Sequence, residues 1–186
     1  LSRGDASSPA NFAQRAAWVW TEVPVPVIAA VHGVAYGGGL QIALGADLRF
    51  VAPDARLSVM EIKWGLVPDM SGTQTLRRLV RLDVAKELTF TGRVVSGTEA
   101  VELGLATRVA ADPRATALEV AAEIAARSPD AIRAAKRLLD ASGVVPVAEG
   151  LQLEEKLQLG LIGRPNQIES VRANLEKRAP RFQDPS

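Results

Sequence analysis

A run of glycines and a pair of carboxylates are the residues of this chain best suited to chemistry. Gly37, Gly38 and Gly39 follow an almost wholly apolar run and lead directly into an apolar helical pattern. Backbone N–H groups at a helix start lack intrahelical partners and, with the helix dipole, stabilise negative charge. The spacing is not G-x-G-x-x-G and no Walker lysine follows, so a developing oxyanion fits better than a nucleotide phosphate. A tight packing turn is an equally weighted alternative.

Two acids, Glu61 and Asp69, follow in an otherwise apolar, turn-rich segment. A carboxylate among apolar neighbours is expected to be partly desolvated, which suits proton transfer. Two such acids could act as base and acid on one substrate. The structural alternatives are that Glu61 pairs with Lys63 or an arginine, and that Asp69 caps a helix starting near Ser71. For each acid taken alone, the structural alternative is favoured.

Four other positions have both a structural and a functional interpretation. The only histidine, His32, excludes a multi-histidine metal centre and is expected to be hydrogen-bonded in the core. Asp47 is expected to bond to the backbone or to Arg49. Trp64 fills the core by default, or walls an apolar ligand pocket. The basic segment at Lys177 is a solvated helix end, or a phosphate contact.

Composition limits the class of protein. The chain has 186 residues, 47% of them hydrophobic, which suits one domain with a possible small appendage. A net charge of +1, from 22 basic and 21 acidic residues, argues against a nucleic-acid partner. No apolar run approaches the ~18 residues of a membrane span. The absence of cysteine excludes disulfides and suits a reducing compartment, so we expect a cytoplasmic location. Because the chain starts without Met, we expect it to be part of a longer protein.

The hydrophobic pattern predicts an α/β class with two regions. The first, residues 1–110, is an α/β core; the second, residues 111–186, is helical. Strands are expected at 27–34, 48–52, 57–60 and 105–109. Helices are expected at 9–20, 39–46, 71–79, 84–90, 98–103, 113–127, 129–142, 146–162 and 166–178. The Ser96-Gly97-Thr98-Glu99 segment has capping-box spacing, and Ser128-Pro129 indicates a helix start.

Taken together, four segments resemble the crotonase (enoyl-CoA hydratase/isomerase) superfamily. They are P-V-I-A-A-V-H-G-V-A-Y-G-G-G-L-Q-I-A-L-G-A-D (26–47), M-E-I-K-W-G-L-V-P-D-M-S-G-T-Q-T-L-R-R-L (60–79), T-G-R-V-V-S-G-T-E-A-V-E-L-G-L-A (91–106) and L-E-K-R (175–178). The resemblance implies a spiral of ββα units with a C-terminal helical trimerisation region, assembled as trimers or pairs of trimers. It also implies an acyl-CoA thioester substrate and no cofactor beyond the CoA of the substrate.

The same resemblance implies roles for individual residues. Gly38 matches a backbone N–H that stabilises a thioester enolate, and the second donor would come from a loop preceding residue 1, so a protein starting at Leu1 is expected to be inactive. Hydratases of the family use two glutamates, at the positions of Gln41 and Glu61. Gln41 is an amide and cannot act as a base. Glu61 with Asp69 resembles the acid pair of the dienoyl-CoA isomerase branch, although that branch commonly has an aspartate at the position of Gln41.

Substrate contacts are expected at Gly37, Gly38, Trp64 and Lys177, the last at a position that can contact CoA phosphates. Gln158 replaces an aromatic residue of the hydratases. The predicted function is double-bond isomerisation of an unsaturated acyl-CoA, with Glu61 and Asp69 moving protons and Gln41 orienting substrate or water. The alternatives are an enoyl-CoA hydratase, a non-catalytic acyl-CoA binder and a structural subunit.

Overall fold

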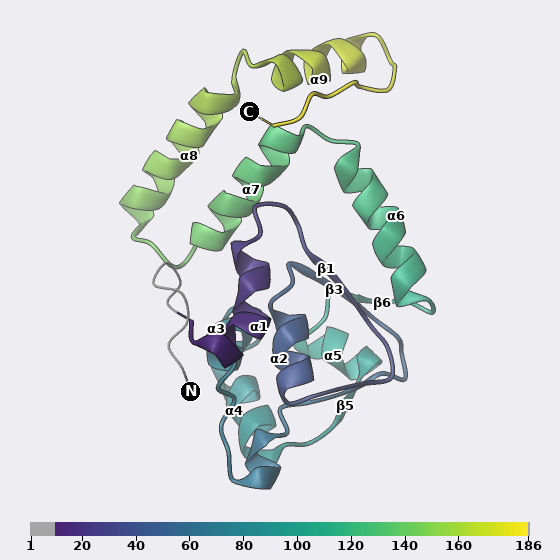
Figure 1. Ribbon diagram of the computed structural model, residues 1–186, viewed down its shortest axis with the longest axis vertical. Coiled ribbons are helices and arrows are strands. Elements are labelled where there is room, and N and C mark those ends of the chain that lie inside the picture. The colour runs from purple at the N-terminus through teal and green to yellow at the C-terminus, as the bar shows by residue number, and fades with distance from the viewer. Residues whose placement is uncertain (1–9, 186) are drawn as a thin grey trace. The chain divides into compact units, whose positions relative to one another are not determined.

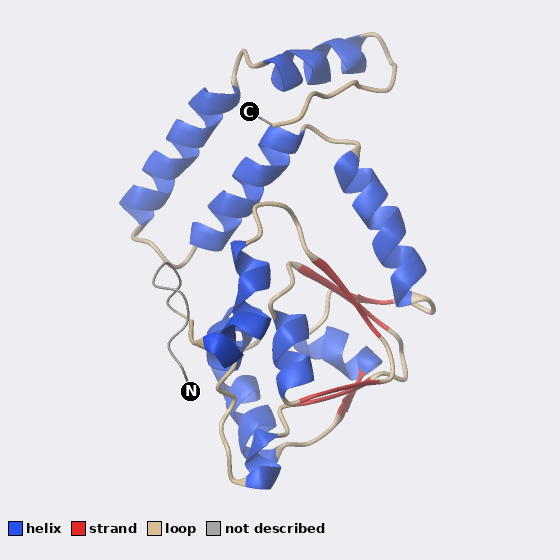
Figure 2. Ribbon diagram, viewed as in Figure 1, coloured by secondary structure: helices blue, strands red, loops and turns tan. Residues whose placement is uncertain are grey.

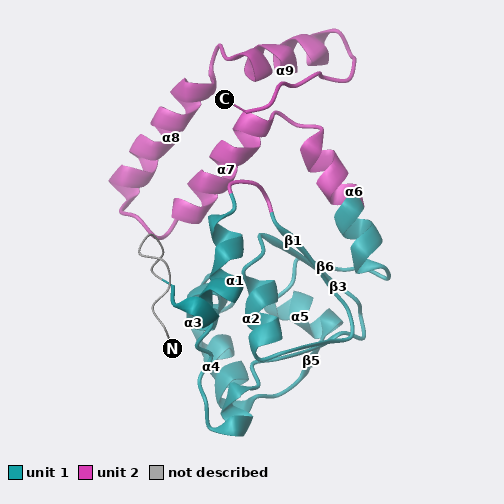
Figure 3. Cartoon of the chain, viewed as in Figure 1, with its two compact units in different colours: residues 1–23, 27–118 teal, residues 24–26, 119–186 magenta. Residues whose placement is uncertain are grey.

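A computed structural model describes residues 10–185 and divides the chain into two compact units, shown separately in colour in Figure 3. One unit comprises Leu1–Val23 and Val27–Leu118, and the other comprises Pro24–Pro26 and Glu119–Ser186. Pro9, the predicted start of the first helix, lies outside the described residues. The predicted domain boundary near residue 110 stays a prediction.

Short strands form two small sheets in the first unit, drawn in red in Figure 2. The first sheet has the order β1 (Ile28–Val31), β3 (Leu48–Val51), β6 (Arg108–Val109), and both of its pairings are parallel. The second has the order β2 (Val34–Tyr36), β4 (Arg56–Ser58), β5 (Val95–Ser96), with β2 and β4 parallel and β5 antiparallel to β4. The α/β class predicted for this region is confirmed.

The single strand predicted over residues 27–34 is wrong in detail, because two strands of different sheets occupy it. Gly33 separates them with a φ of 65°, a left-handed conformation that ends an extended run and that glycine adopts without steric cost. His32 lies at this turn and is exposed. The predicted core role of His32 is therefore also wrong.

Two helices of the first unit begin where a local side chain satisfies a free N–H group. Asn11 and Gln14 form a reciprocal capping box at α1, with both bonds at 3.0 Å. Ser96 Oγ accepts a bond from Glu99 N at 3.1 Å at α5 as predicted, whereas the Glu99 carboxylate pairs with Arg93 instead of closing a box. These helices are α1 (Phe12–Glu22), α2 (Gly38–Leu44), the 3₁₀ helix η1 (Glu61–Trp64), α3 (Gly72–Leu79), α4 (Leu82–Thr91) and α5 (Gly97–Leu103) (Figure 1).

One apolar cluster joins both sheets to helices α2 to α5. Leu40 and Leu44 of α2 and Leu57 of β4 are each no more than 3% exposed. Burial of such side chains contributes about 1.5–3 kcal/mol each relative to exposure. The cluster thus fixes α2 and β4, the elements that flank the candidate site.

The remaining helices are α6 (Pro113–Ala125), which spans the division between the units, and α7 (Pro129–Ala141), α8 (Val147–Leu161) and α9 (Pro165–Leu175). The predicted ranges agree with them to within three residues. Ser128 caps α7 in front of Pro129, as predicted. Within residues 10–185, no helix combines the length and hydropathy needed to cross a bilayer.

Candidate active site

The glycine turn leaves one backbone amide open. Gly37 has a φ of 51°, and its N–H donates to Ser58 O at 3.0 Å, which ties the turn to β4. Gly38 is the first residue of α2, and among residues 10–185 no acceptor is found for its N–H. The prediction that these glycines form a turn opening a helix is confirmed. The amide of Gly38 is free to receive an anionic oxygen.

Glu61 is held in the interior beside this turn. The carboxylate begins η1, which ends at the left-handed Gly65, and the residue is only 9% exposed. A Cβ placed on Gly37 would lie 3.2 Å from Glu61 Oε1, so the turn and the carboxylate are in close contact. Glu61 Oε2 is buried, and within the described residues it has no hydrogen-bond partner. A buried, unpaired carboxylate oxygen is an uncommon and costly feature that a substrate or water would satisfy.

Gln41 is the partner of Glu61. Its Nε2 donates to Glu61 Oε1 at 2.6 Å, and its side chain is almost fully buried. No ion pair of Glu61 with Lys63 or an arginine occurs in the part of the chain that the structure describes. The structural alternative of a salt-bridged Glu61 is therefore not what the fold forms.

Backbone amides at the start of α3 complete the arrangement. The N–H groups of Met70 and Gly72 both donate to Gln41 Oε1, each at 2.9 Å. A Cβ on Gly72 would lie 2.6 Å from that oxygen, so only glycine fits. The roles of Met70 and Gly72 were not predictable from the sequence, because backbone donors leave no side-chain signature. The sole available signal was the glycine at position 72.

Asp69 lies on the exposed side of the same loop, next to Met70. The residue that precedes α3 is Ser71, in a left-handed conformation (φ 69°), and no side-chain cap is present there. Asp69 therefore does not cap α3. The predicted apolar setting of Asp69 is wrong because Asp69 is exposed, whereas the next residue, Met70, is half-buried with its Sδ 3.0 Å from the place of a Cβ on Gly38. The proposed proton-transfer role of Asp69 stays a prediction.

The predictions for Trp64 and Asp47 have different outcomes. Trp64 is 70% exposed, with the Lys63 ammonium 5.7 Å from the centre of its ring, so the default core-filling interpretation is wrong. Asp47 Oδ2 accepts a hydrogen bond from Val27 N at 2.6 Å, which confirms a backbone-bonded structural acid. Burial lowers the pKa of the neighbouring Arg49 guanidinium, which donates to Leu105 O at 2.8 Å, while the charge of Asp47 partly opposes this shift.

A small cavity of about 240 Å³ lies at α1 and the start of α3. It is lined by Ala10, Gln14, Trp18, Ser71 and Gln74. None of the predicted site residues lines it.

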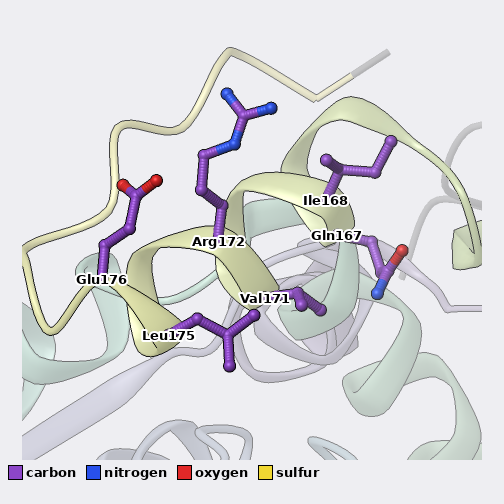
Figure 4. Close-up of a pocket in the computed structure, with 6 residues that line it drawn as sticks. All are labelled: Gln167, Ile168, Val171, Arg172, Leu175 and Glu176. Atoms are coloured by element: carbon purple, nitrogen blue, oxygen red, sulfur yellow. The ribbon is translucent and has the colours of Figure 1, made fainter.

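Lys177 lies just beyond α9, exposed and in a left-handed conformation (φ 52°). The adjacent Arg178 is engaged with Glu169 and Glu176, each contact at 2.6 Å. An open groove of about 420 Å³ runs along α9 (Figure 4) and is lined by Gln167, Ile168, Val171, Arg172, Leu175 and Glu176. Lys177 does not line this groove. Its predicted contact with a CoA phosphate stays a prediction.

The fold and the site together describe an α/β chain in which one glycine turn carries an open helix-start amide, at Gly38, and lies against a buried carboxylate, that of Glu61. This arrangement is suited to stabilising an oxyanion while moving a proton. The sequence model of the enoyl-CoA hydratase/isomerase family matches residues 5–185. The chain belongs to this family, within the crotonase superfamily.

Individual proteins agree with this assignment. The chain is 39% identical over 181 residues to the mouse protein named enoyl-CoA hydratase domain-containing protein 2, mitochondrial, covering 92% of this chain and 61% of the mouse protein. It is 37% identical over 166 residues to mouse mitochondrial methylglutaconyl-CoA hydratase, covering 86% and 53%. The chain thus spans between half and two thirds of the length of these relatives.

Solved structures confirm the fold. The crystal structure of enoyl-CoA hydratase from Bacillus anthracis superposes with a TM-score of 0.89 at 35% identity, covering 93% of this chain and 68% of that chain. The predicted crotonase-like fold is confirmed. The relationship to the dienoyl-CoA isomerase branch, the C-terminal trimerisation role, the absence of a cofactor and the cytoplasmic location stay predictions; the mouse relatives are named as mitochondrial.

Proposed function

We propose that this chain catalyses double-bond isomerisation of an unsaturated acyl-CoA. One acid removes a proton from the acyl chain, the electron pair moves onto the thioester oxygen, and a proton returns at another carbon of the conjugated system. The product therefore has the same elemental composition as the substrate and differs from it in the positions of the double bonds. The observation that carries the proposal is the buried carboxylate of Glu61 at the glycine turn: its Oε2 has no hydrogen-bond partner within the described residues, it lies against Gly37, and the next residue, Gly38, begins α2.

In this mechanism the Gly38 N–H holds the enolate oxygen, an interaction that gains strength as the negative charge develops. Glu61 and Asp69 exchange protons with the acyl carbons. The amide of Gln41 cannot take a proton from water at neutral pH, which supports isomerisation over addition of water by two glutamates. The exposed side chain of Trp64 contacts the acyl-CoA, and the exposed ammonium of Lys177 binds a phosphate of CoA.

Hydration of a 2-enoyl-CoA is the second candidate, since the two mouse relatives carry hydratase in their names. Glu61 would then be the only acid–base residue. Liquid chromatography coupled to mass spectrometry separates the two reactions. Incubation with a 3,5-dienoyl-CoA yields a product of new retention time and unchanged mass for isomerisation, and incubation with a 2-enoyl-CoA yields a product heavier by one water for hydration. Binding of acyl-CoA without turnover of either substrate would establish a non-catalytic binder instead.

We further propose self-association into trimers or pairs of trimers. Helix α8 has no buried residue, and it exposes large apolar side chains at Val147, Leu151 and Leu159. Exposed apolar surface of this kind marks protein interfaces. Sedimentation velocity on the purified protein tests the assembly, and a monomer at micromolar concentration would exclude it.

A further inference from the structure

We infer that Gln41 is a positioning residue that restricts proton transfer by Glu61 to a single oxygen atom, Oε2. The inference deepens the proposed function and rests on it for its kinetic part. Gln41 was predicted to orient substrate or water directly. We infer instead that it acts through Glu61.

The orientation of the Gln41 amide is set by its backbone partners. Its oxygen accepts from two N–H donors, those of Met70 and Gly72. If the Gln41 side-chain amide were flipped, its NH₂ group would face the N–H groups of Met70 and Gly72, and donors would face donors with no acceptor between them. The NH₂ group must therefore face Glu61, and the assignment of oxygen and nitrogen follows from the donors alone.

This orientation decides which Glu61 oxygen can carry a proton. The NH₂ group of Gln41 is only a donor toward Glu61, so Oε1 must remain an acceptor in every protonation state that keeps the 2.6 Å bond. Any proton that Glu61 holds is consequently on Oε2. That oxygen is buried and is free of hydrogen bonds within the described residues, so it is the oxygen of the carboxylate that remains free to hold and pass on a proton.

The arrangement is also rigid. Gln41 lies in α2, and the two N–H donors belong to the residues that begin α3, so the amide links two helices to the carboxylate. Gly72 is packed so closely on Gln41 Oε1 that an added Cβ would lie 2.6 Å away. Misplacement of a reacting group by about 1 Å can reduce a rate by roughly 100-fold.

Three variants test this. Gln41→Met removes both ends of the amide at similar size. Gly72→Ala leaves Gln41 and Glu61 in place chemically but pushes the amide by its Cβ. Thr73→Ala, the next residue of α3 and exposed, is the matched control. We expect kcat of Gln41→Met and Gly72→Ala to fall by about 100-fold with KM within about twofold of the wild type, and Thr73→Ala to retain wild-type values.

Nuclear magnetic resonance tests the hydrogen bonds of the Gln41 amide independently of turnover. The side-chain NH₂ protons of Gln41 should exchange slowly with solvent in the wild type, because one of them donates to Glu61 Oε1, and faster in Glu61→Ala, which removes that acceptor. The backbone amides of Met70 and Gly72 should exchange with solvent faster in Gln41→Met and remain slow in Gln41→Glu, which keeps the acceptor oxygen.

The outcomes separate the two claims. If the wild type turns over no unsaturated acyl-CoA, the proposed function fails, while the resonance measurements still decide the positioning role. Gln41 NH₂ protons that exchange equally fast in the wild type and in Glu61→Ala overturn the inference, as does a Gln41→Met variant with unchanged kcat in an active enzyme.

Discussion

The carboxylate of Glu61 lies against Gly37, with Oε1 3.2 Å from the place where a Cβ on that glycine would stand. Gly37 also has a φ of 51° with a ψ of −120°, a sparsely populated conformation that costs a non-glycine residue about 1–3 kcal/mol. We therefore expect Gly37→Ala to lower the free energy of unfolding by about that amount and to displace Glu61, with a fall in kcat. Urea unfolding and steady-state kinetics measure the two effects.

Gly39→Ala is the matched control for stability. Gly39 has no positive φ, and no atom would lie within 4 Å of its added Cβ. Alanine also has the higher helix propensity, so this variant should be at least as stable as the wild type. An equal loss of stability in both variants would show that the contact with Glu61 is not the cause.

Glu61→Gln and Asp69→Asn test the two proposed proton carriers. Removal of a proton-transfer group typically lowers turnover by about 10²–10⁴-fold, and we expect each substitution to do so on a dienoyl-CoA. Circular dichroism should show an unchanged fold. Because Asp69 is exposed while Glu61 is buried, a large effect of Glu61→Gln with none of Asp69→Asn would remove Asp69 from the mechanism and leave a single acid.

Motifs of local origin were predictable from the sequence at this site. The strand, glycine turn and helix around Gly37 and Gly38 follow from an apolar run interrupted by residues of special backbone freedom. The burial of Glu61 followed from its apolar neighbours. The contact between Gln41 and Glu61 was not predictable from pattern, because it joins residues 20 positions apart through tertiary packing.

The predictions that were wrong failed because tertiary packing, which local sequence patterns do not show, decides these features. The run at 27–34 was predicted as one strand although His32 and Gly33 lie within it, and the positive φ of Gly33 is where it divides between two sheets. Trp64 was expected in the core by its residue type, yet η1 directs it outward. Backbone donors such as the N–H of Met70 are present at almost every position, so composition cannot show which of them the fold uses.

Trp64→Ala tests the apolar side of the proposed substrate contact. With 70% of the residue exposed, we expect the free energy of unfolding to change by no more than about 0.5 kcal/mol. If the indole contacts the acyl chain, Trp64→Ala should raise KM relative to the wild type, and the increase should be larger for longer acyl chains, while kcat changes little. A KM that is unaffected for acyl chains of every length would exclude Trp64 from binding.

Lys177→Gln tests the proposed phosphate contact. The ammonium is exposed, so its loss should weaken binding of CoA measured by calorimetry, and the difference from the wild type should shrink at high salt. Lys156→Gln, an exposed lysine of α8, is the matched control for loss of one positive charge. Equal weakening in both variants would indicate net charge and not a contact at Lys177.

The C-terminal segment should loosen in acid because of Glu169. Hydrogen bonds from Arg178 at 2.6 Å and from the backbone N–H of Arg181 at 2.7 Å lower the pKa of the Glu169 carboxyl to about 2, from an ordinary value of 4.5. Since the folded state holds the lower pKa, the stabilisation is fully present above about pH 4.5 and is lost as the pH falls toward 2. Amide exchange of Arg181, followed from pH 5 to 2, should accelerate across this window. In Glu169→Gln the exchange, corrected for its intrinsic pH dependence, should be insensitive to pH there, whereas Glu176→Gln, which removes only a contact to Arg178 Nε, should retain the transition.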